Sequence, residues 1–289
     1  MVLDIIYNPL AGGLKKMAKN LNLLVEHLKK RGVEFRLHKT EYEKHAVKLT
    51  KDAIEKGATT IVSMGGDGTN NEVLNGFCNF ENVTFGIIPC GTGNDFASHV
   101  GIPLDVTKAA DIIIDKPATY VDYMQLPTIR ALNVVGVGID VDVLTRYQAL
   151  KKKTKAGYYK CLIKSLLSYK CQNITTDVNG ERKDQTAFIA AVANASMFGG
   201  GLKICPDAIE HDGKLDLVTV DEIKGLKIVN ALLKLKSGKI DKLKQTHRTY
   251  AETVKIVGDE NTIINVDGEL HKNIPFEVEV IHNKLKMHR

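Results

Sequence analysis

The stretch that decides the fold runs from residue 60 to residue 97 and reads TIVSMGGDGTNNEVLNGFCNFENVTFGIIPCGTGNDFA. Two apolar runs in it, Thr60–Met64 and Val83–Ile88, have the composition of buried strands, and the spacing within Asn70–Phe77 predicts a helix between them. A glycine-rich segment follows each strand. This order predicts parallel strands whose glycine segments meet at the carboxyl edge of one sheet, where ligands bind in such folds.

The same alternation extends toward the amino terminus, with strands expected at Val2–Tyr7 and Val33–His38 and helices at Lys15–Lys30 and Lys44–Lys56. From about residue 120 the pattern changes to short strand-like runs separated by turns. These runs are 120–126, 130–137, 174–178, 186–193, 214–220, 253–257, 263–266 and 276–281, interrupted by helical stretches at 158–169 and 224–235. We therefore predict an α/β chain with a Rossmann-like three-layer domain at 1–123 and a mainly antiparallel β-sandwich domain at 124–280. We leave open that the tail, 281–289, returns to the first domain.

The composition is that of a globular protein, since 44% of the 289 residues are hydrophobic and 26% are charged. No uncharged apolar run approaches the roughly 20 residues that span a bilayer. The five cysteines are an odd number without a C-x-x-C pair, which argues against a disulfide framework or a zinc site. These features predict a cytoplasmic protein with free thiols.

The basic excess lies in the second part of the chain. Residues 1–123 contain 14 Lys and Arg against 15 Asp and Glu, whereas residues 124–289 contain 26 against 19. Such asymmetry points to nucleic acid, an anionic membrane or a phosphorylated ligand, and a solvated basic face is the alternative. The chain lacks a helix-turn-helix, zinc-finger or RNP signature, so we expect no nucleic-acid partner.

Three glycine-rich segments follow predicted strands, at 8–13 (NPLAGG), 65–71 (GGDGTNN) and 91–95 (GTGND). Glycines at such turns let backbone N–H groups approach a phosphate closely, and a following helix adds partial positive charge. Tight turns alone are the alternative. None of the segments matches the P-loop or completes the dinucleotide pattern, which disfavours a Walker ATPase and an NAD-binding Rossmann enzyme.

Asp67 lies inside the second glycine segment. A carboxylate beside a polyphosphate repels it unless a divalent cation lies between them. The placement therefore predicts a Mg²⁺-nucleotide site in which Asp67 holds the metal directly or through water. A turn-capping aspartate is the alternative.

The segments GGDGT with Asn71-Glu72, and PCGTGNDFA at 89–97, resemble the nucleotide loops of the diacylglycerol kinase catalytic domain. The chain is most similar to the soluble bacterial diacylglycerol and lipid kinases, relatives of sphingosine and ceramide kinases. GGDGT is shared with NAD kinases, whereas GTGNDFA is more specific. The resemblance implies an ATP- and Mg²⁺-dependent kinase that phosphorylates a lipid hydroxyl, with diacylglycerol converted to phosphatidic acid as the leading reaction. An NAD kinase-like phosphotransferase, another lipid alcohol such as phosphatidylglycerol or a sphingoid base, and a regulator without catalysis are alternatives.

The resemblance also implies roles for residues of the first domain. Candidates for ATP contacts are Asn8, Thr40, Gly65, Gly66, Asp67, Gly68, Thr69, Asn70, Asn71 and Thr92. Thr40 is an equally good helix N-cap. Asp95 and Asp122 are candidate members of a carboxylate and water network around the metal, although each is also a common capping or turn residue.

In the second, lipid-substrate domain, residues 194–201, 206–208 and 212–216 resemble the family segment that holds a structural Mg²⁺. The resemblance gives the side chain of Asp212 and the backbone carbonyls of Ile209 and Lys214 as ligands. The segment 265–269 (NVDGE) resembles the one that supplies the family's general base, so Asp267 takes that role and Glu269 supports it. A hairpin turn at Asp-Gly is the alternative.

Two basic segments, 151–164 and 234–244, combine lysines with aromatic or aliphatic residues. The first contains Lys151, Lys152 and Lys153 before the stripe that starts at Tyr158. This composition favours docking on anionic headgroups, so we expect peripheral association with the inner face of the cell membrane. A helix packed on the β domain with solvated lysines is the alternative. The resemblance is also compatible with a homodimer.

Overall fold

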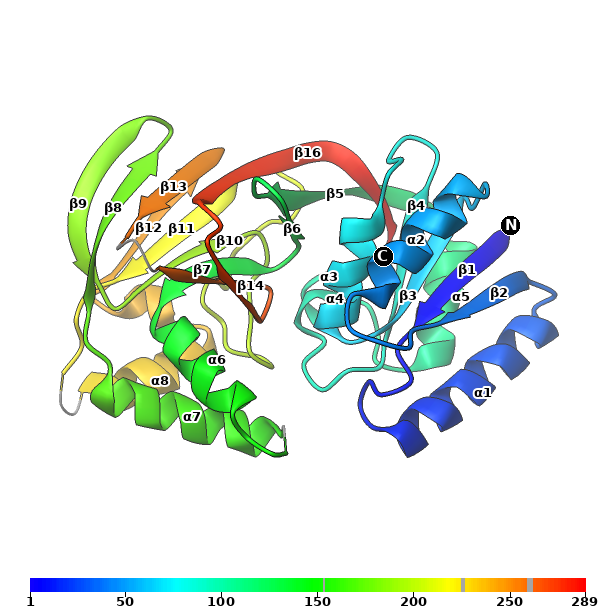
Figure 1. Ribbon diagram of the computed structural model, residues 1–289, viewed down its shortest axis with the longest axis horizontal. Helices are drawn as coiled ribbons and strands as arrows, with labels where there is room; N and C mark the ends of the chain where they lie inside the picture. Colours follow the sequence, from blue (N-terminus) through cyan, green and yellow to red (C-terminus); the bar gives the residue numbers. More distant parts are fainter. Residues whose placement is uncertain (153, 225–226, 259–261) are drawn as a thin grey trace. The chain divides into compact units, whose positions relative to one another are not determined.

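The computed structural model describes residues 1–289 except 153, 225–226 and 259–261. It divides into two compact units (Figure 1). The first unit comprises Met1–Asp122 together with His282–Arg289, and the second comprises Tyr123–Ile281. The carboxyl-terminal segment therefore belongs to the first unit.

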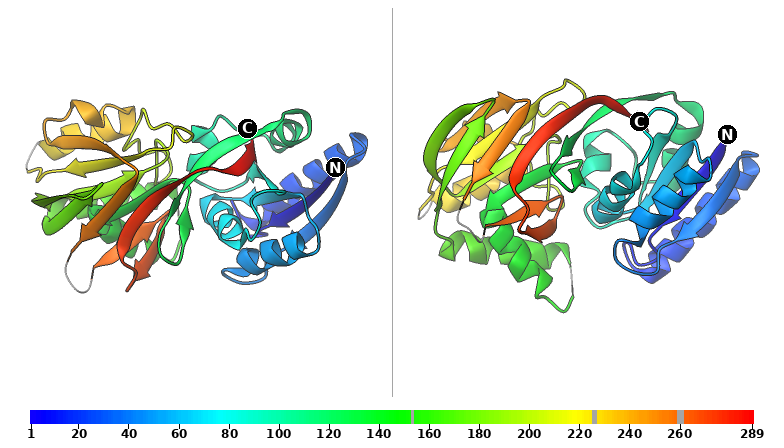
Figure 2. Two further views of the ribbon diagram at one scale, coloured as in Figure 1. Left: turned by 90° about the horizontal axis from the view of Figure 1, so that it is seen from above. Right: turned by 45° about the horizontal axis from the view of Figure 1, so that its top comes forward.

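The first unit is built on a parallel sheet in the order β2-β1-β3-β4. Its strands are β1 (Val2–Tyr7), β2 (Glu34–Lys39), β3 (Thr60–Gly65) and β4 (Thr84–Pro89), and the last part of β16 (Phe276–His288) pairs with β4 in parallel. The helices are α1 (Leu14–Lys30), α2 (His45–Glu55), α3 (Asp67–Gly76), α4 (Asp95–His99) and α5 (Val106–Asp115). Helix α1 packs against α5 on one face of the sheet and α2 against α3 on the other, which gives the three predicted layers (Figure 2).

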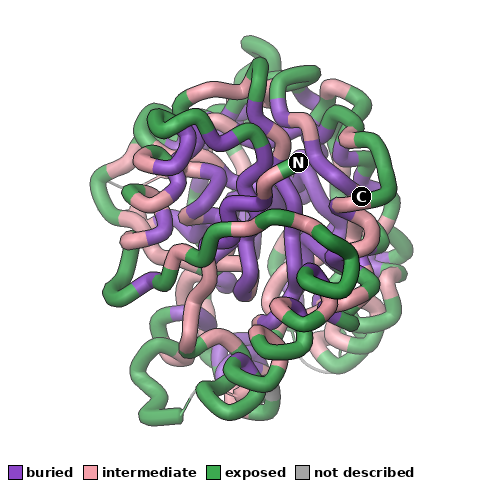
Figure 3. The backbone as a smooth tube through the Cα atoms, turned by 90° about the vertical axis from the view of Figure 1, so that its right-hand side faces the viewer, coloured by how far each residue is buried: buried purple, intermediate pink, exposed green. Residues whose placement is uncertain are grey.

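Burial explains why these segments fold as they do. Strand β3 is buried along its whole length, and the strands form a buried centre beneath exposed loops and helix surfaces (Figure 3). Helix α1 buries Met17, Leu24 and Leu28, which recur on one face, and burial of a leucine is worth about 1.5 to 3 kcal/mol. Beyond its end Gly32 adopts a left-handed φ of 65°, which closes the helix at little steric cost.

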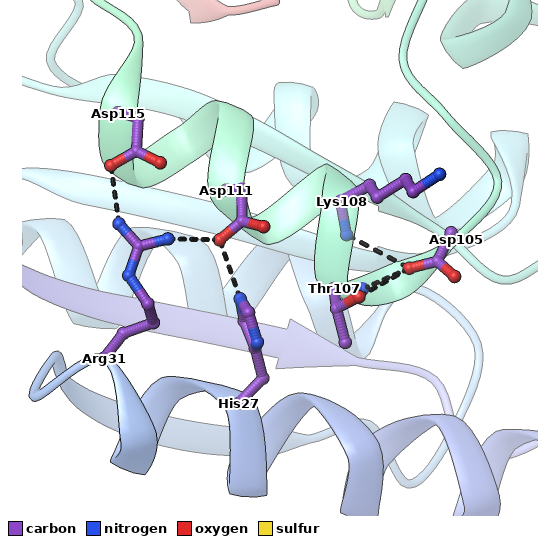
Figure 4. Close-up of polar contacts among 7 residues, drawn as sticks. All are labelled: His27, Arg31, Asp105, Thr107, Lys108, Asp111 and Asp115. Atoms are coloured by element: carbon purple, nitrogen blue, oxygen red, sulfur yellow. Dashed lines mark hydrogen bonds and ion pairs between the residues drawn. The ribbon is translucent and has the colours of Figure 1, made fainter.

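Polar contacts fix the packing of α1 on α5 (Figure 4). His27 Nε2 lies 2.7 Å from Asp111 Oδ1, and Arg31 contacts both Asp111 and Asp115 at 2.5 and 2.6 Å. Asp105 caps α5 by accepting from the backbone N–H groups of residues 107 and 108. The sequence pattern did not predict α4 or α5.

The second unit is a β-sandwich covered by helices on one side. One sheet has the antiparallel order β12-β11-β10-β7-β14-β15, and the other contains β16-β13-β8-β9 with β5 and β6. The strands are β5 (Ala118–Gln125), β6 (Arg130–Ala131), β7 (Val134–Gly138), β8 (Gln172–Val178), β9 (Glu181–Ala187), β10 (Ile189–Ala193), β11 (Leu215–Val220), β12 (Thr246–Ala251), β13 (Thr253–Val257), β14 (Ile263–Val266) and β15 (Glu269–Lys272). The helices are α6 (Ile139–Gln148), α7 (Lys155–Ser168) and α8 (Lys227–Ser237), followed by the short η1 (Ile240–Lys242).

Alternation along β7 places side chains in two cores. Val135 and Val137 join the core between the two sheets, together with Val254 and Phe276 from the facing sheet. Val134 joins the core between the first sheet and helices α6, α7 and α8. This arrangement confirms the predicted α/β class with a mainly antiparallel second part.

The structure corrects several predicted boundaries. The strand expected at 130–137 is two strands, β6 and β7, because the Asp267 carboxylate accepts hydrogen bonds from the backbone N–H groups between them. The strand expected at 186–193 breaks at Phe188, where the chain passes from β9 in one sheet to β10 in the other. The strand expected at 276–281 continues to His288 as β16. Elements α6, β12 and β15, and the part of β9 before residue 186, were not predicted.

Candidate functional site

The three glycine segments meet at the carboxyl edge of the sheet in the first unit. The carbonyl of Gly65 accepts from the backbone N–H groups of Cys90 and Gly91 at 2.7 and 3.1 Å. A Cβ on Gly91 would lie 2.4 Å from the Cα of Gly66, so the two backbones touch. A Cβ on Gly12, which has a φ of 64°, would lie 2.3 Å from the Cys90 carbonyl oxygen. Glycine is required here because any side chain would separate the segments.

Asn94 fixes the third glycine segment. It has a left-handed φ of 57°, its Oδ1 accepts from the Gly91 N–H at 2.8 Å, and its Nδ2 donates to the Gly91 carbonyl at 3.0 Å. Both contacts bind the side chain to the backbone of one residue, and asparagine tolerates the left-handed region better than most residues. The turn before α4 is therefore preorganised.

The second glycine segment is partly helical, which corrects the predicted helix start at residue 70. Helix α3 begins at Asp67, with the Gly66 carbonyl accepting from the Asn70 N–H at 3.0 Å. Gly68 lies in the first helical turn, and the Thr69 side chain packs directly over Gly65. The backbone of this segment thus forms the amino terminus of a helix, which is a favourable place for an anion.

Asp67 joins the second and third glycine segments. Its Oδ1 accepts from the Phe96 N–H at 3.3 Å, at the amino terminus of α4. Burial raises the pKa of the Asp67 carboxyl, while backbone N–H groups of residues 94–96 act in the opposite direction. The capping contact that we held as the alternative is thus present, and the metal role remains a prediction.

Two amides of α3 point away from solvent. Asn70 is 1% exposed, and its Oδ1 accepts from Ser63 Oγ of β3 at 2.7 Å. Its Nδ2 has no hydrogen-bond partner among the residues that the structure describes. Asn71 is also buried and accepts from Asn75. The ATP contacts that the resemblance implies for Asn70 and Asn71 remain a prediction, and in the structure their side chains contact Ser63 and Asn75.

The remaining candidates for ATP contacts follow neighbouring strands. Asn8 follows β1 and accepts from the Leu10 N–H through Oδ1 at 2.9 Å. Thr40 follows β2 and donates its N–H to the Tyr7 carbonyl at 3.0 Å. The alternative role of Thr40 as a helix N-cap is wrong, because α2 begins only at His45. Thr92 is exposed at the tip of the third glycine segment.

The two network candidates have different surroundings. Asp95 is 5% exposed and is the first residue of α4. Asp122 is fully buried, and its Oδ1 lies 2.7 Å from Nδ1 of His282 in the carboxyl-terminal segment. The structure therefore gives Asp122 a contact with a residue 160 positions away, which sequence reasoning did not find.

In the second unit, Asp267 forms the turn between β14 and β15. Asp267 and Gly268 have φ values of 49° and 92°, as a tight hairpin turn requires. The carboxylate accepts three successive backbone N–H groups, those of Leu132 at 2.6 Å, Asn133 at 2.8 Å and Val134 at 3.0 Å. The hairpin alternative thus describes the local structure, and the role as general base remains a prediction.

Glu269 opens β15 opposite Val266, and its Oε2 lies 3.9 Å from His271 Nε2. This distance is too long for a hydrogen bond. The predicted supporting role of Glu269 therefore rests on the resemblance.

The predicted structural Mg²⁺ site lies in the turn before β11. Asp212 is exposed, and its Oδ1 accepts from the Lys214 N–H at 3.0 Å. Ile209 is 48% exposed. An oxygen donor set of one carboxylate with carbonyls and water suits a hard cation. Within the described part of the chain, no group of three or more His, Cys, Asp or Glu side chains forms a metal cluster.

An apolar cavity that sequence reasoning missed lies between helices α6, α7 and α8 and the first sheet of the second unit. It has a volume of about 60 Å³, and Asp140 is the acidic residue among its otherwise apolar or aromatic lining. Asp140 Oδ2 accepts from Asn265 Nδ2 at 2.9 Å, while Oδ1 is buried without a partner in the described residues. Burial raises the pKa of Asp140 to about 6. A Cβ on Gly136 would lie 2.3 Å from Oδ2, which explains the glycine at that position.

The basic segments lie in helices and their flanks. Lys153 falls outside the described residues. Helix α7 packs on the core through Tyr158, Leu162 and Leu166, while Lys160 and Lys164 are exposed. Across the described residues, no helix has the length and apolar character needed to cross a bilayer.

Both parts of the chain match known families. Residues 3–126 match the diacylglycerol kinase catalytic domain, and residues 133–289 match the YegS C-terminal NAD kinase beta sandwich-like domain. The diacylglycerol kinase of Bacillus subtilis (strain 168) is 31% identical over 278 residues, which cover 94% of this chain and 91% of that protein. A protein of Xanthomonas campestris pv. campestris (strain 8004) named "Probable lipid kinase YegS-like" is 28% identical over 282 residues, which cover 93% of this chain and 91% of that protein.

Solved structures share the fold. A diacylglycerol kinase from Bacillus anthracis str. Sterne has a TM-score of 0.74 at 22% identity, covering 99% of this chain and 96% of that one. An NAD kinase from Archaeoglobus fulgidus in complex with ATP has a TM-score of 0.52 at 15% identity, and the match covers 99% of this chain and 92% of that one.

The matches to both units define the chain as a kinase of an ATP-using class. It belongs to the family of lipid kinases that includes diacylglycerol kinases and YegS-like enzymes, as the glycine motifs predicted.

Proposed function

We propose that this chain transfers the γ-phosphoryl group of ATP to the 3-hydroxyl of diacylglycerol, which yields phosphatidic acid, and that it requires Mg²⁺. The contact of Gly66 with Gly91 carries the nucleotide half of the proposal. It joins two glycine segments that lead into helices α3 and α4, so backbone N–H groups and helix amino termini converge at one edge of the sheet.

A metal is needed because Asp67 lies between these segments. Magnesium bound through Asp67, directly or through water, offsets the repulsion between this carboxylate and the phosphates. The acceptor half rests on family membership. Asp267 is the proposed general base, and its three N–H contacts hold the carboxylate in one orientation.

Two other acceptors are alternatives with support of their own. The relative from Xanthomonas campestris is named as a lipid kinase without a stated acceptor, which keeps other lipid alcohols under consideration. The fold shared with an NAD kinase makes NAD the soluble acceptor to compare.

The test is phosphoryl transfer from γ-labelled ATP, with and without Mg²⁺, to diacylglycerol, phosphatidylglycerol or a sphingoid base in mixed micelles, or to NAD in solution. We expect label in diacylglycerol only, and its loss on chelation of Mg²⁺. Label in another acceptor alone would refute the proposed substrate, and no label in any acceptor would refute the proposed reaction.

The role of Asp67 has a matched control. Asp67→Ala and Asp105→Ala each remove an aspartate that accepts from the amino terminus of a helix in the first unit. If Asp67 holds the metal, its variant loses at least about 100-fold in turnover while Asp105→Ala stays active. Equal activity of the two variants would reduce Asp67 to a helix cap.

A further inference from the structure

Two aromatic side chains stack on each other just beyond the end of β2. The ring centroids of Tyr42 and His45 lie 4.2 Å apart, and the ring planes are inclined by only 10°. Tyr42 is 60% exposed, so one face of its ring is covered by His45 and the other is open to solvent. Core packing therefore does not account for an aromatic residue at this position. We call the pair the Tyr42–His45 stack.

Hydrogen bonds hold the stack in place. Nδ1 of His45 accepts from the Glu41 N–H at 3.2 Å, and the His45 N–H donates to the Tyr42 carbonyl at 3.3 Å. The next residue, Ala46, donates its N–H to the Glu72 carboxylate at 3.1 Å. Glu72 belongs to α3, the helix that begins in the second glycine segment. The stack is thus anchored to an element that we propose for phosphate binding.

The stack follows the same edge of the sheet as the glycine segments. Thr40 donates its N–H to Tyr7 at the end of β1, and Asn8 donates its N–H to Met64 at the end of β3. The ends of β2, β1 and β3 are therefore neighbours at strand spacing, which places Thr40 about 10 Å from Gly65. This separation is comparable with that between the base and the terminal phosphates of an extended nucleotide.

The charges of the loop decide which part of a nucleotide fits it. Glu41, Glu43 and Lys44 are exposed beside the stack, which sets two carboxylates against one ammonium. This balance disfavours phosphate groups at the loop. An uncharged flat ring, in contrast, gains contact with the open face of Tyr42. The ligand that fits is therefore a neutral aromatic ring attached to phosphates that reach the glycine segments.

We propose that the Tyr42–His45 stack binds the adenine base of ATP, with the open face of Tyr42 against the base. The inference deepens the proposed function and rests on its nucleotide half, because the glycine segments must hold the phosphates of the same molecule. It gives the loop after β2 a part in the choice of nucleotide, since purines stack more strongly than pyrimidines.

Calorimetry with ATP and with inorganic tripolyphosphate, each in Mg²⁺ and with the full chain, separates the base from the phosphates. Loss of one base–aromatic stack should weaken ATP binding to Tyr42→Ala by about 5- to 150-fold and leave tripolyphosphate binding unchanged. Tyr42→Phe keeps the ring and should bind ATP as wild type does. Wild type should prefer ATP to UTP, and Tyr42→Ala should lose most of that preference.

Tyr120→Ala is the matched control. Tyr120 is 43% exposed on β5, and its ring centroid lies 5.8 Å from the ammonium of Lys286. Lys286 pairs with Thr84, the first residue of β4, so Tyr120 lies toward the sheet edge opposite the glycine segments. The Tyr120→Ala variant should bind ATP with wild-type affinity.

Fluorescence reports the contact directly, because the chain contains no tryptophan. Tyr42→Trp introduces a single fluorophore at the stack. AMP and ATP should quench its emission, and tripolyphosphate should not. Tyr120→Trp should be insensitive to all three ligands.

In the kinase assay the stack should contribute to binding alone. Tyr42→Ala should raise the KM for ATP and leave kcat unchanged, because a base remote from the γ-phosphate is bound equally in the ground and transition states. A general disturbance of the site would lower kcat as well.

Three results would overturn the stacking proposal: unchanged ATP affinity in Tyr42→Ala, an equal loss of ATP and tripolyphosphate affinity, or equal quenching of the two tryptophans. If the chain bound ATP with the expected dependence on Tyr42 but phosphorylated no acceptor, the proposed function would fall and the stack would stand. If it phosphorylated diacylglycerol while Tyr42→Ala kept full ATP affinity, the stack alone would fall. Absence of ATP binding to wild type would refute both.

Discussion

The carboxylate of Asp267 should stabilise the second unit whatever part it takes in catalysis. It accepts three backbone N–H groups from Leu132, Asn133 and Val134, which are 1%, 4% and 2% exposed. Asp267→Ala leaves these three buried donors without their acceptor, at a cost of about 1 to 3 kcal/mol each. Because Asp267 itself is only half-buried, water can replace part of the loss. We therefore expect a destabilisation of about 3 to 5 kcal/mol.

The assay is thermal and urea unfolding followed by circular dichroism. For a unit of this size the expected loss lowers the melting temperature by roughly 6 to 20 °C. Asp267→Asn keeps one acceptor oxygen but places its amide N–H group opposite a backbone N–H donor. Its melting temperature should therefore lie between those of Asp267→Ala and wild type. Asp177→Ala, which removes one backbone N–H contact from Gly180 and an exposed contact from Arg182 Nε at the β8–β9 turn, should cost only about 1 kcal/mol.

Two outcomes separate the structural role of Asp267 from its catalytic role. If Asp267→Ala lost activity while it unfolded at the wild-type temperature, the three contacts would carry no stability and this reasoning would be wrong. If Asp267→Ala showed the expected destabilisation but the molecules that remain folded turned over substrate at the wild-type rate, Asp267 would not be the general base.

Three further predictions concern other residues. The pKa of Asp140, about 6 against the usual 3.8, means that the folded state binds this proton more tightly, so the associated stability is complete below about pH 4 and is lost as pH rises through 6. Wild type should lose about 3 kcal/mol more than Asp140→Asn between pH 4 and pH 7 in urea unfolding, and parallel curves would contradict the assignment. Gly91→Ala should abolish ATP binding measured by calorimetry, because its Cβ would lie 2.4 Å from Gly66 Cα, and unchanged affinity would exclude the glycine contact as the nucleotide site. Added Mg²⁺ should raise the melting temperature of wild type and not that of Asp212→Ala. An equal rise in both proteins would show that Asp212 is not a ligand of the structural metal.

The parts of the fold that sequence predicted are those determined by local composition. Strand β3 is buried on both faces, so its apolar run, Thr60–Met64, was sufficient to identify it. The glycine segments were placed correctly because each follows such a strand. The start of α3 was missed, since Gly66 and Gly68 are poor helix formers and the first turn is stabilised by contacts across the sheet edge.

The missed features depend on residues far apart in the chain. The 130–137 strand is divided by Asp267, which lies more than 130 positions away. The contact of Asp122 with His282 spans 160 positions. Asp140 follows an ordinary glycine motif, and its buried oxygen becomes evident only when α6, α7 and α8 enclose the cavity. A local sequence pattern contains no information on such pairs. A family resemblance assigns a role to a residue but does not say which residues it contacts.

Strand β16 has a consequence for the order in which the chain folds during synthesis. Its last residues pair with β4, and residues 282–289 belong to the first unit. A ribosome therefore releases residues 1–122 long before the strand that covers the edge of β4 has been made. Until then β4 is an unpaired edge, which is a site for aggregation. A fragment that ends at residue 122 should be poorly soluble for this reason, and co-expression of residues 276–289 as a separate peptide should improve its recovery.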